Sequence, residues 1–163
     1  INAIKTQLRS LVDKKQIYKK AYSLLSRRDY SVVMMRNKLR EFALGDSGDS
    51  RFETFLEDVI EDLKEKKWLS DERLVSSFLN SKGQLYGEKR IWLELKKLGI
   101  GESLIEKMLE TTEGRDADKA RVLLGRKFKG KANSIKEKVK RRDYLMRRGF
   151  SYGVCNKLVL QDE

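Results

Sequence analysis

Apolar residues recur along this chain three or four positions apart, which is the spacing of a helix face. The clearest stripe comprises Phe52, Leu56, Val59 and Leu63. Such spacing places the apolar side chains on one side of an α-helix. No stretch alternates apolar and polar residues long enough to indicate a strand, and the sequence contains no proline that would interrupt helical hydrogen bonding. The pattern therefore predicts an all-α fold.

The stripes and the breaks between them predict nine or ten helices. Segments rich in Gly, Ser or Asp interrupt the pattern at 43–51, 111–116 and 129–134 and are expected to be loops. The expected helices span 3–12, 17–26, 32–42, 52–66, 71–82, 88–98, 102–111, 116–128, 135–148 and 152–160.

These helices fall into groups of three with a period near fifty residues. Residues typical of helix starts, Ser50, Gly101 and Ser151, precede the third helix of each group. A recurring three-helix unit is typical of helical repeat proteins, so we expect an elongated array of three tandem repeats. The expected repeats span 17–67, 68–113 and 114–163, after an N-terminal helical extension at 1–16.

Charge is abundant and unevenly distributed. The 163 residues carry 37 Lys and Arg against 25 Asp and Glu, a formal net charge of +12. Residues 115–148 hold 14 basic and 4 acidic side chains, whereas 53–72 hold 3 basic and 8 acidic side chains. A basic segment of this density attracts phosphates. We expect sequence-independent contact with a polyanion; the alternative is a solvated face that only aids solubility.

The candidate contact residues come from both ends of the chain and from its middle. Lys136, Lys138 and Lys140 belong to the densest run, which holds too many charges to face a core. Tyr144 and Tyr152 add aromatic surface nearby that can stack on bases or anchor a protein contact. The set expected to contact DNA or a protein partner is Lys19, Lys20, Arg27, Arg28, Lys89, Arg90, Arg126, Lys127, Lys129, Lys131, Arg141, Arg142, Arg147 and Arg148.

Residue types that support catalysis are scarce. The absence of His excludes Ser-His-Asp and Cys-His catalysis and His-ligated metal sites. A single cysteine, Cys155, excludes an internal disulfide framework and a Cys-cluster zinc site. No apolar run approaches the roughly 18 residues of a membrane span, and no signal peptide is visible. We therefore expect a non-enzymatic cytoplasmic protein with no cofactor, no metal and no membrane association.

Three features that resemble chemical sites have plainer interpretations. Residues 125–132 match the spacing of a phosphate-binding loop, but Ala132 stands where Ser or Thr would bind magnesium, and a helix is expected before it. Glu57 and Glu61 are spaced to hold a cation, which leaves a nuclease as the least favoured alternative, but a solvated helix face is expected. Cys155 lies in an apolar pattern and is expected in the core.

Three segments resemble the RecX family, the bacterial regulators of the RecA recombinase. WLSDERL at 68–74 is similar to that family's Leu-any-Asp-acid-Arg step, GEKRIWLELKKLGI at 87–100 to its G-x-x-R-I-x-x-E-L segment, and LMRRGFSY at 145–152 to its L-x-R-R-G-F-S signature. The resemblance runs in order from about residue 18 to 160. One departure is Met34, which replaces a usual acid and removes half of the capping box expected with Ser31.

This resemblance implies three tandem three-helix repeats that lie in the groove of the RecA–DNA filament and suppress its activities without catalysis. It also implies direct binding to single- or double-stranded DNA, a monomer, and a role in homologous recombination, DNA repair and the SOS response. Gly87 and Gly149 would serve turns, and Phe150 the repeat core. The expected function is a mainly inhibitory modulator of RecA; the alternative is an architectural DNA-binding protein without a filament partner.

Overall fold

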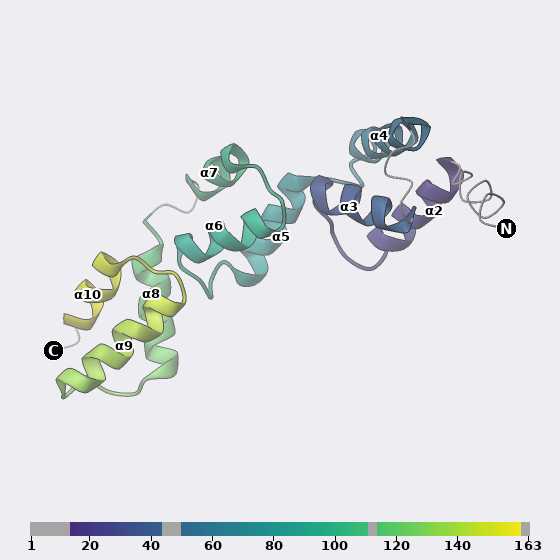
Figure 1. Ribbon diagram of the computed structural model, residues 1–163. Helices are drawn as coiled ribbons and strands as arrows, with labels where there is room; N and C mark the ends of the chain where they lie inside the picture. Colours follow the sequence, from purple (N-terminus) through teal and green to yellow (C-terminus); the bar gives the residue numbers. More distant parts are fainter. Residues whose placement is uncertain (1–13, 44–49, 111–113, 161–163) are drawn as a thin grey trace. The chain divides into compact units, whose positions relative to one another are not determined.

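The computed structural model describes residues 14–43, 50–110 and 114–160, and within them every regular element is an α-helix (Figure 1). The all-α class predicted from the sequence is confirmed, and the observed helices begin and end within three residues of the expected bounds. The expected helix at 3–12 lies outside the described residues. The helices are α2 (Lys14–Leu25), α3 (Val32–Phe42), α4 (Ser50–Glu65), α5 (Asp71–Lys82), α6 (Glu88–Lys97), α7 (Glu102–Glu110), α8 (Asp116–Lys127), α9 (Ile135–Arg147) and α10 (Tyr152–Leu160).

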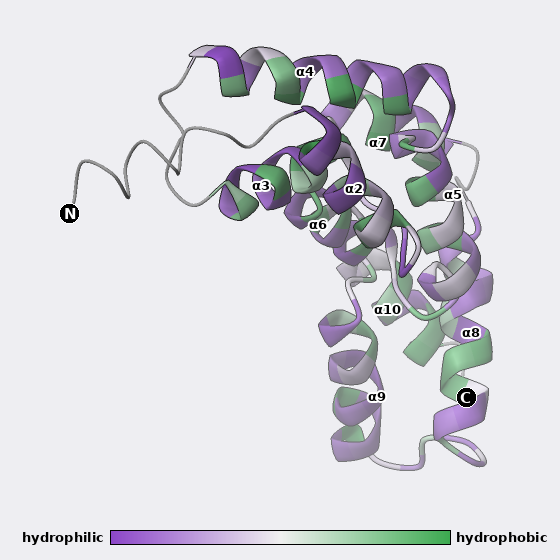
Figure 2. Cartoon of the chain, turned by 90° about the vertical axis from the view of Figure 1, so that its right-hand side faces the viewer, coloured by the Kyte–Doolittle hydropathy of each residue, from purple (hydrophilic) through white to green (hydrophobic). Residues whose placement is uncertain are grey.

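The chain forms two compact units, at 1–74 and 75–163. In the first unit, α2, α3 and α4 pack against one another around a shared core. Ile17, Met35 and Leu56 contribute fully buried side chains to it, one from each helix. Figure 2 shows green apolar residues along the side of α4 that meets α2 and α3, and purple hydrophilic residues on its other side. The apolar stripe read from the sequence is thus the buried face.

Helix α3 begins with two separate caps. The Ser31 hydroxyl accepts a hydrogen bond from the Met34 amide at 3.1 Å, and the Asp71 carboxylate accepts one from the Val32 amide at 2.8 Å. The first amides of a helix have no partner within the helix, so each acceptor satisfies a group that would otherwise be unpaired. Asp71 thus caps the amide of Val32, a different group from the Ser31 amide that an acid at position 34 would cap.

The second unit contains a three-helix group formed by α8, α9 and α10. Its core includes Leu145, Phe150 and Cys155, which are at most 3% exposed. The predictions that Phe150 and Cys155 belong to the core are confirmed. Burial raises the pKa of the Cys155 thiol, which keeps it protonated and unreactive. The helix expected before the apparent phosphate loop is α8, so that loop follows no buried strand.

The start of α6 packs closely on the turn between α9 and α10. The Gly87 amide donates to the Arg148 carbonyl at 2.9 Å. Gly149 has φ +85°, and a Cβ there would lie 2.4 Å from the Cβ of Arg90. A Cβ at Gly87 would lie 2.5 Å from the Gly149 carbonyl oxygen. Gly149 serves the predicted turn with its positive φ, whereas Gly87 is the N-cap of α6 with φ −74° and is required there by close approach.

Asp116, the first residue of α8, forms a hydrogen bond with the first residue of α6. Its carboxylate accepts a hydrogen bond from the Glu88 amide at 3.0 Å. This is the same arrangement as that of Asp71, the first residue of α5, with the Val32 amide at the start of α3. The recurrence of one capping contact at equivalent helix starts is what a repeat architecture produces.

Candidate nucleic-acid interface

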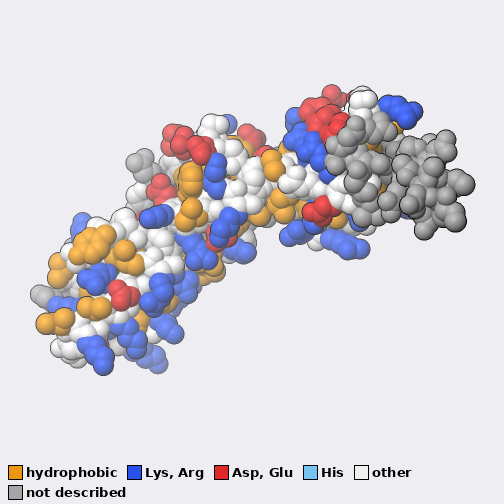
Figure 3. Space-filling view, viewed as in Figure 1, with side chains coloured by type: hydrophobic (Ala, Val, Ile, Leu, Met, Phe, Trp, Pro, Cys, Tyr) orange, Lys and Arg blue, Asp and Glu red, His pale blue; other side chains and the backbone are white. Residues whose placement is uncertain are grey.

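Seven exposed basic side chains lie in the last turn of α8, in the α8–α9 connection and on the solvent side of α9. Lys136, Lys140 and Arg147 are four and seven positions apart and share one side of α9. Figure 3 shows Lys and Arg side chains gathered over α8 and α9. We call this set the cationic face; it comprises Arg126, Lys127, Lys129, Lys131, Lys136, Lys140 and Arg147.

Acidic side chains near the cationic face interact with groups outside that face. Asp116 pairs with Lys119 at 2.7 Å, and Asp118 pairs with Arg121 at 2.8 Å. The Glu137 carboxylate accepts from the Asn133 amide. Within the described ranges, none of the seven basic groups has a carboxylate at salt-bridge distance. Their positive field is therefore not cancelled locally and is available to an external anion.

The expectation that the whole basic run of α9 faces solvent is wrong for Arg141. This side chain is 6% exposed, and its guanidinium donates to the Gly130 carbonyl at 2.7 Å and lies 5.3 Å from the Phe128 ring centroid. It holds the α8–α9 loop against α9. Arg141 is thus a structural cation and does not belong to the candidate interface.

Arg148 and Arg142 also make contacts with other residues of the second unit. Arg148 donates to the Leu85 carbonyl at 3.1 Å and lies 4.7 Å from the ring centroid of Tyr144. Arg142 is half-buried, with its Nε 3.7 Å from Asp143. Of the cations on α9 that were expected to bind a partner, Arg147 is exposed, whereas Arg141 is buried and Arg142 is half-buried.

The remaining predicted contact residues do not join the cationic face. In the second unit, Lys89 is exposed on α6, and Arg90 pairs with Glu94 at 3.0 Å. In the first unit, Lys19 and Arg27 are exposed, Lys20 lies 5.3 Å from the Phe42 ring centroid, and Arg28 lies 4.6 Å from that of Tyr30. The structure therefore brings together Arg126, Lys127, Lys129, Lys131 and Arg147 from the predicted set and adds Lys136 and Lys140 to them.

The acidic residues of α4 form ion pairs at the surface of the first unit. Glu57 accepts two hydrogen bonds from the Arg36 guanidinium at 2.7 and 2.8 Å, and this contact lowers the pKa of Glu57. Asp62 pairs with Lys66 at 2.6 Å. These pairs lie at the surface, since the side chains of Glu57 and Glu61 are 45% and 58% exposed, in agreement with the predicted solvated face. Among the described residues, no group of three or more His, Cys, Asp or Glu is arranged to hold a metal ion.

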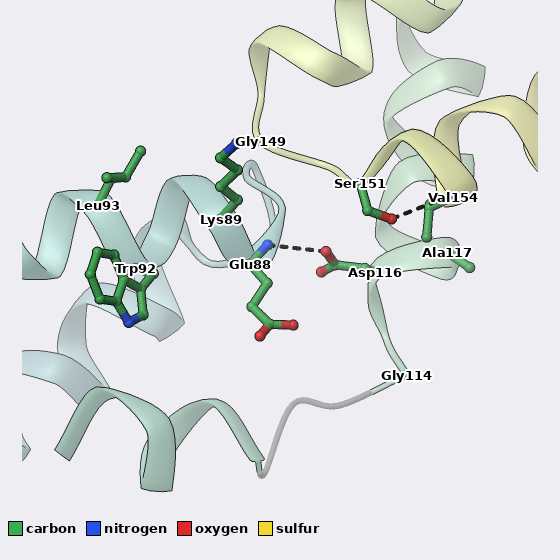
Figure 4. A pocket seen from close by; sticks show the side chains of 10 residues that line it. All are labelled: Glu88, Lys89, Trp92, Leu93, Gly114, Asp116, Ala117, Gly149, Ser151 and Val154. Carbon is green, nitrogen blue, oxygen red and sulfur yellow. Dashed lines mark hydrogen bonds between the residues drawn. The ribbon is translucent and has the colours of Figure 1, made fainter. Parts of the chain in front are cut away.

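Sequence reasoning missed an apolar groove between α6 and the α9–α10 region. One part, about 620 Å³, is lined by Trp92, Leu93 and Val154 (Figure 4). An adjoining part of about 420 Å³ is lined by Leu93, Met146 and Tyr152. We call these five residues the apolar groove. The signal in the sequence was that Leu93 and Met146 lie off the buried stripes of their own helices.

Comparison with known proteins agrees with this architecture. Residues 115–159, which nearly coincide with α8–α10, match the family model described as RecX, third three-helix domain. The crystal structure of RecX from Lactobacillus salivarius superimposes with a TM-score of 0.72, covering 91% of this chain and 95% of that one at 20% identity. None of the described helices is both long and apolar enough to span a membrane. The fold is that of an all-α helical repeat protein.

The sequence comparison identifies the family. The chain is 33% identical to "Regulatory protein RecX" of Haemophilus influenzae over 145 residues, which cover 86% of this chain and 91% of that protein. It is 28% identical to the protein of the same name from Ralstonia pickettii over 140 residues, covering 86% and 84%. This chain belongs to the RecX family.

Proposed function

We propose that this chain is a non-enzymatic modulator, mainly an inhibitor, of a RecA-type recombinase. It acts as a monomer in the cytoplasm and docks along the RecA–DNA filament through basic and apolar patches, in homologous recombination, DNA repair and the SOS response. Membership of a family whose relatives are named regulatory proteins supports a regulatory role. The three repeats at 17–67, 68–113 and 114–163 are the units that we propose engage the filament.

The observation that carries this proposal is the cationic face. Its side chains are exposed, and among the described residues no carboxylate neutralises them. Lys136 and Arg147 are separated by about 16 Å along the helix axis, so the row can follow a phosphate backbone. Lys and Arg neutralise phosphates without reading base identity, so this contact is independent of sequence.

The proposed mechanism is multivalent. Each repeat makes a modest contact, and once one repeat is bound, the next lies at high effective concentration near the following protomer. A periodic filament offers such a succession of equivalent sites, whereas bare DNA offers phosphates alone. The chain would therefore discriminate filament from free DNA through the sum of its contacts.

The test is the DNA-dependent ATPase of RecA filaments on single-stranded DNA, measured with increasing amounts of this chain. Inhibition is expected from the wild-type chain, and weaker inhibition from a variant with Lys136→Glu, Lys140→Glu and Arg147→Glu. A matched control carries Lys82→Glu, Lys97→Glu and Lys107→Glu, which changes the net charge equally at exposed positions outside α8–α10. Binding of DNA with no effect on the ATPase would favour the architectural alternative.

A further inference from the structure

Three large apolar side chains of the apolar groove, each from a different helix, are exposed to solvent. Leu93 on α6 is 45% exposed, Met146 on α9 is 43% exposed, and Tyr152 on α10 is 58% exposed. All three line the same part of the groove. Exposed apolar residues that gather in one concave place, with charged residues around them, are typical of a surface that binds another molecule.

The core of the second unit does not require these side chains. On α6 the buried positions are Ile91 and Leu95, and Leu93 lies between them, about 200° around the helix from either. On α9 Leu145 is buried, and Met146 lies about 100° around the axis from it. Leu93 and Met146 are thus not among the buried residues of their helices.

The rim of the groove is basic in the part lined by Met146 and Tyr152. Lys89 and Arg147 line the same part of it, and Arg142 lies 6.0 Å from the Tyr152 ring centroid. The other end is lined by two acidic residues: the Asp116 carboxylate accepts from the Glu88 amide and pairs with Lys119, while the Glu88 side chain is exposed. Figure 4 shows the Asp116 contact and the open space beside Trp92 and Glu88. A complementary occupant would therefore carry apolar residues flanked by carboxylates.

A protein segment fits this groove better than a nucleic-acid strand. Three of the five groove residues, Leu93, Met146 and Val154, are aliphatic and offer no flat surface for stacking a base, whereas Trp92 and Tyr152 are aromatic and can stack on one. The row of cations suited to phosphates lies on the neighbouring side of α9, where Lys136 and Lys140 are located. The two surfaces thus differ in chemistry although they share one helix.

We propose that the apolar groove binds an acidic amphipathic helix of the partner protein, whose apolar residues, three or four positions apart, pack on Leu93, Met146 and Tyr152. This inference rests on the proposed function, in which the partner is the RecA filament. It assigns the protein contact to the groove and the phosphate contact to the cationic face, with Arg147 at the boundary between the two.

The test measures binding of the full chain to two probes, a labelled oligo(dT) and a RecA filament assembled on the same oligonucleotide with a slowly hydrolysed ATP analogue. The variant carries Leu93→Gln and Met146→Gln, which remove apolar surface without changing charge. The control carries Val122→Gln and Leu160→Gln, at positions that are 52% and 54% exposed. Tyr152→Gln provides a second groove variant, and helicity by circular dichroism verifies the fold of each.

Both groove variants should bind the filament about tenfold more weakly than wild type or more, with unchanged affinity for oligo(dT). Wild-type affinity of a folded groove variant for both probes would overturn the inference. Equal loss on both probes would overturn it too, because the groove would then be a nucleic-acid site. A wild-type chain that binds the filament no better than oligo(dT) would instead contradict the proposed function itself.

Discussion

Reversing three charges on the cationic face should change how DNA binding depends on salt. Lys136→Glu, Lys140→Glu and Arg147→Glu alter exposed side chains that have no carboxylate partner among the described residues, so the fold should be unaffected. Each phosphate contact contributes about 0.7 to the slope of log Kobs against log salt concentration on single-stranded DNA. Loss of three contacts should therefore make the slope shallower by about 2.

The assay is fluorescence anisotropy of labelled oligo(dT), titrated with protein at several salt concentrations between about 50 and about 200 mM. The wild-type chain should bind more tightly throughout, but its affinity should fall more steeply as salt rises. The ratio of the two affinities should thus shrink by about an order of magnitude across this range. Arg141 is left unchanged because its guanidinium holds the Gly130 carbonyl.

An unchanged slope in the folded variant would refute the assignment of the cationic face. The control with Lys82→Glu, Lys97→Glu and Lys107→Glu separates a local contact from a general effect of net charge. Its slope should stay within about one contact of the wild-type value, about 0.7. If both variants lost slope equally, the attraction would depend on overall charge and not on α9.

Two further predictions concern the fold. Gly149→Ala should lower the free energy of unfolding, measured by urea titration, by more than about 1–2 kcal/mol, because φ is +85° and the new Cβ would meet Arg90. Gly125→Ala, in open space within α8, should raise it by about 0.5–1 kcal/mol. Equal effects of the two substitutions would contradict the close approach at the turn. The Arg36 contact lowers the pKa of Glu57 below its ordinary 4.5, so its stabilisation is present above pH 4.5 and is lost as pH falls through the folded-state pKa. Arg36→Ala should flatten the decrease of Tm on acidification below pH 4.5, and an unaltered decrease would show that another group is responsible.

Local patterns were enough to predict the helices, because each apolar stripe reflects which side of that helix is buried. The cap of α3 could not be predicted in this way. The Val32 amide at the start of this helix donates a hydrogen bond to Asp71, which lies 39 residues further along the chain. Such a contact depends on how two helices meet, which periodicity within one helix does not report.

Only the part of the candidate site that lies within one segment of the chain could be predicted from the sequence. Charge density identified the basic segment, and Arg147 is exposed as expected. Arg141 was wrongly placed at the surface, because its burial depends on an aromatic ring and a carbonyl supplied by the α8–α9 loop. The groove combines Leu93 and Met146 from helices that are far apart in sequence, so neither residue alone indicates it.

The most direct test of the central claim is the amount of chain bound per RecA protomer at a salt concentration where bare oligo(dT) no longer retains it. Docking on a periodic filament predicts saturable binding at a fixed ratio to protomers, since protein contacts supplement the salt-sensitive phosphate contacts. Binding to the filament that disappears at the same salt concentration as binding to bare DNA would contradict the account.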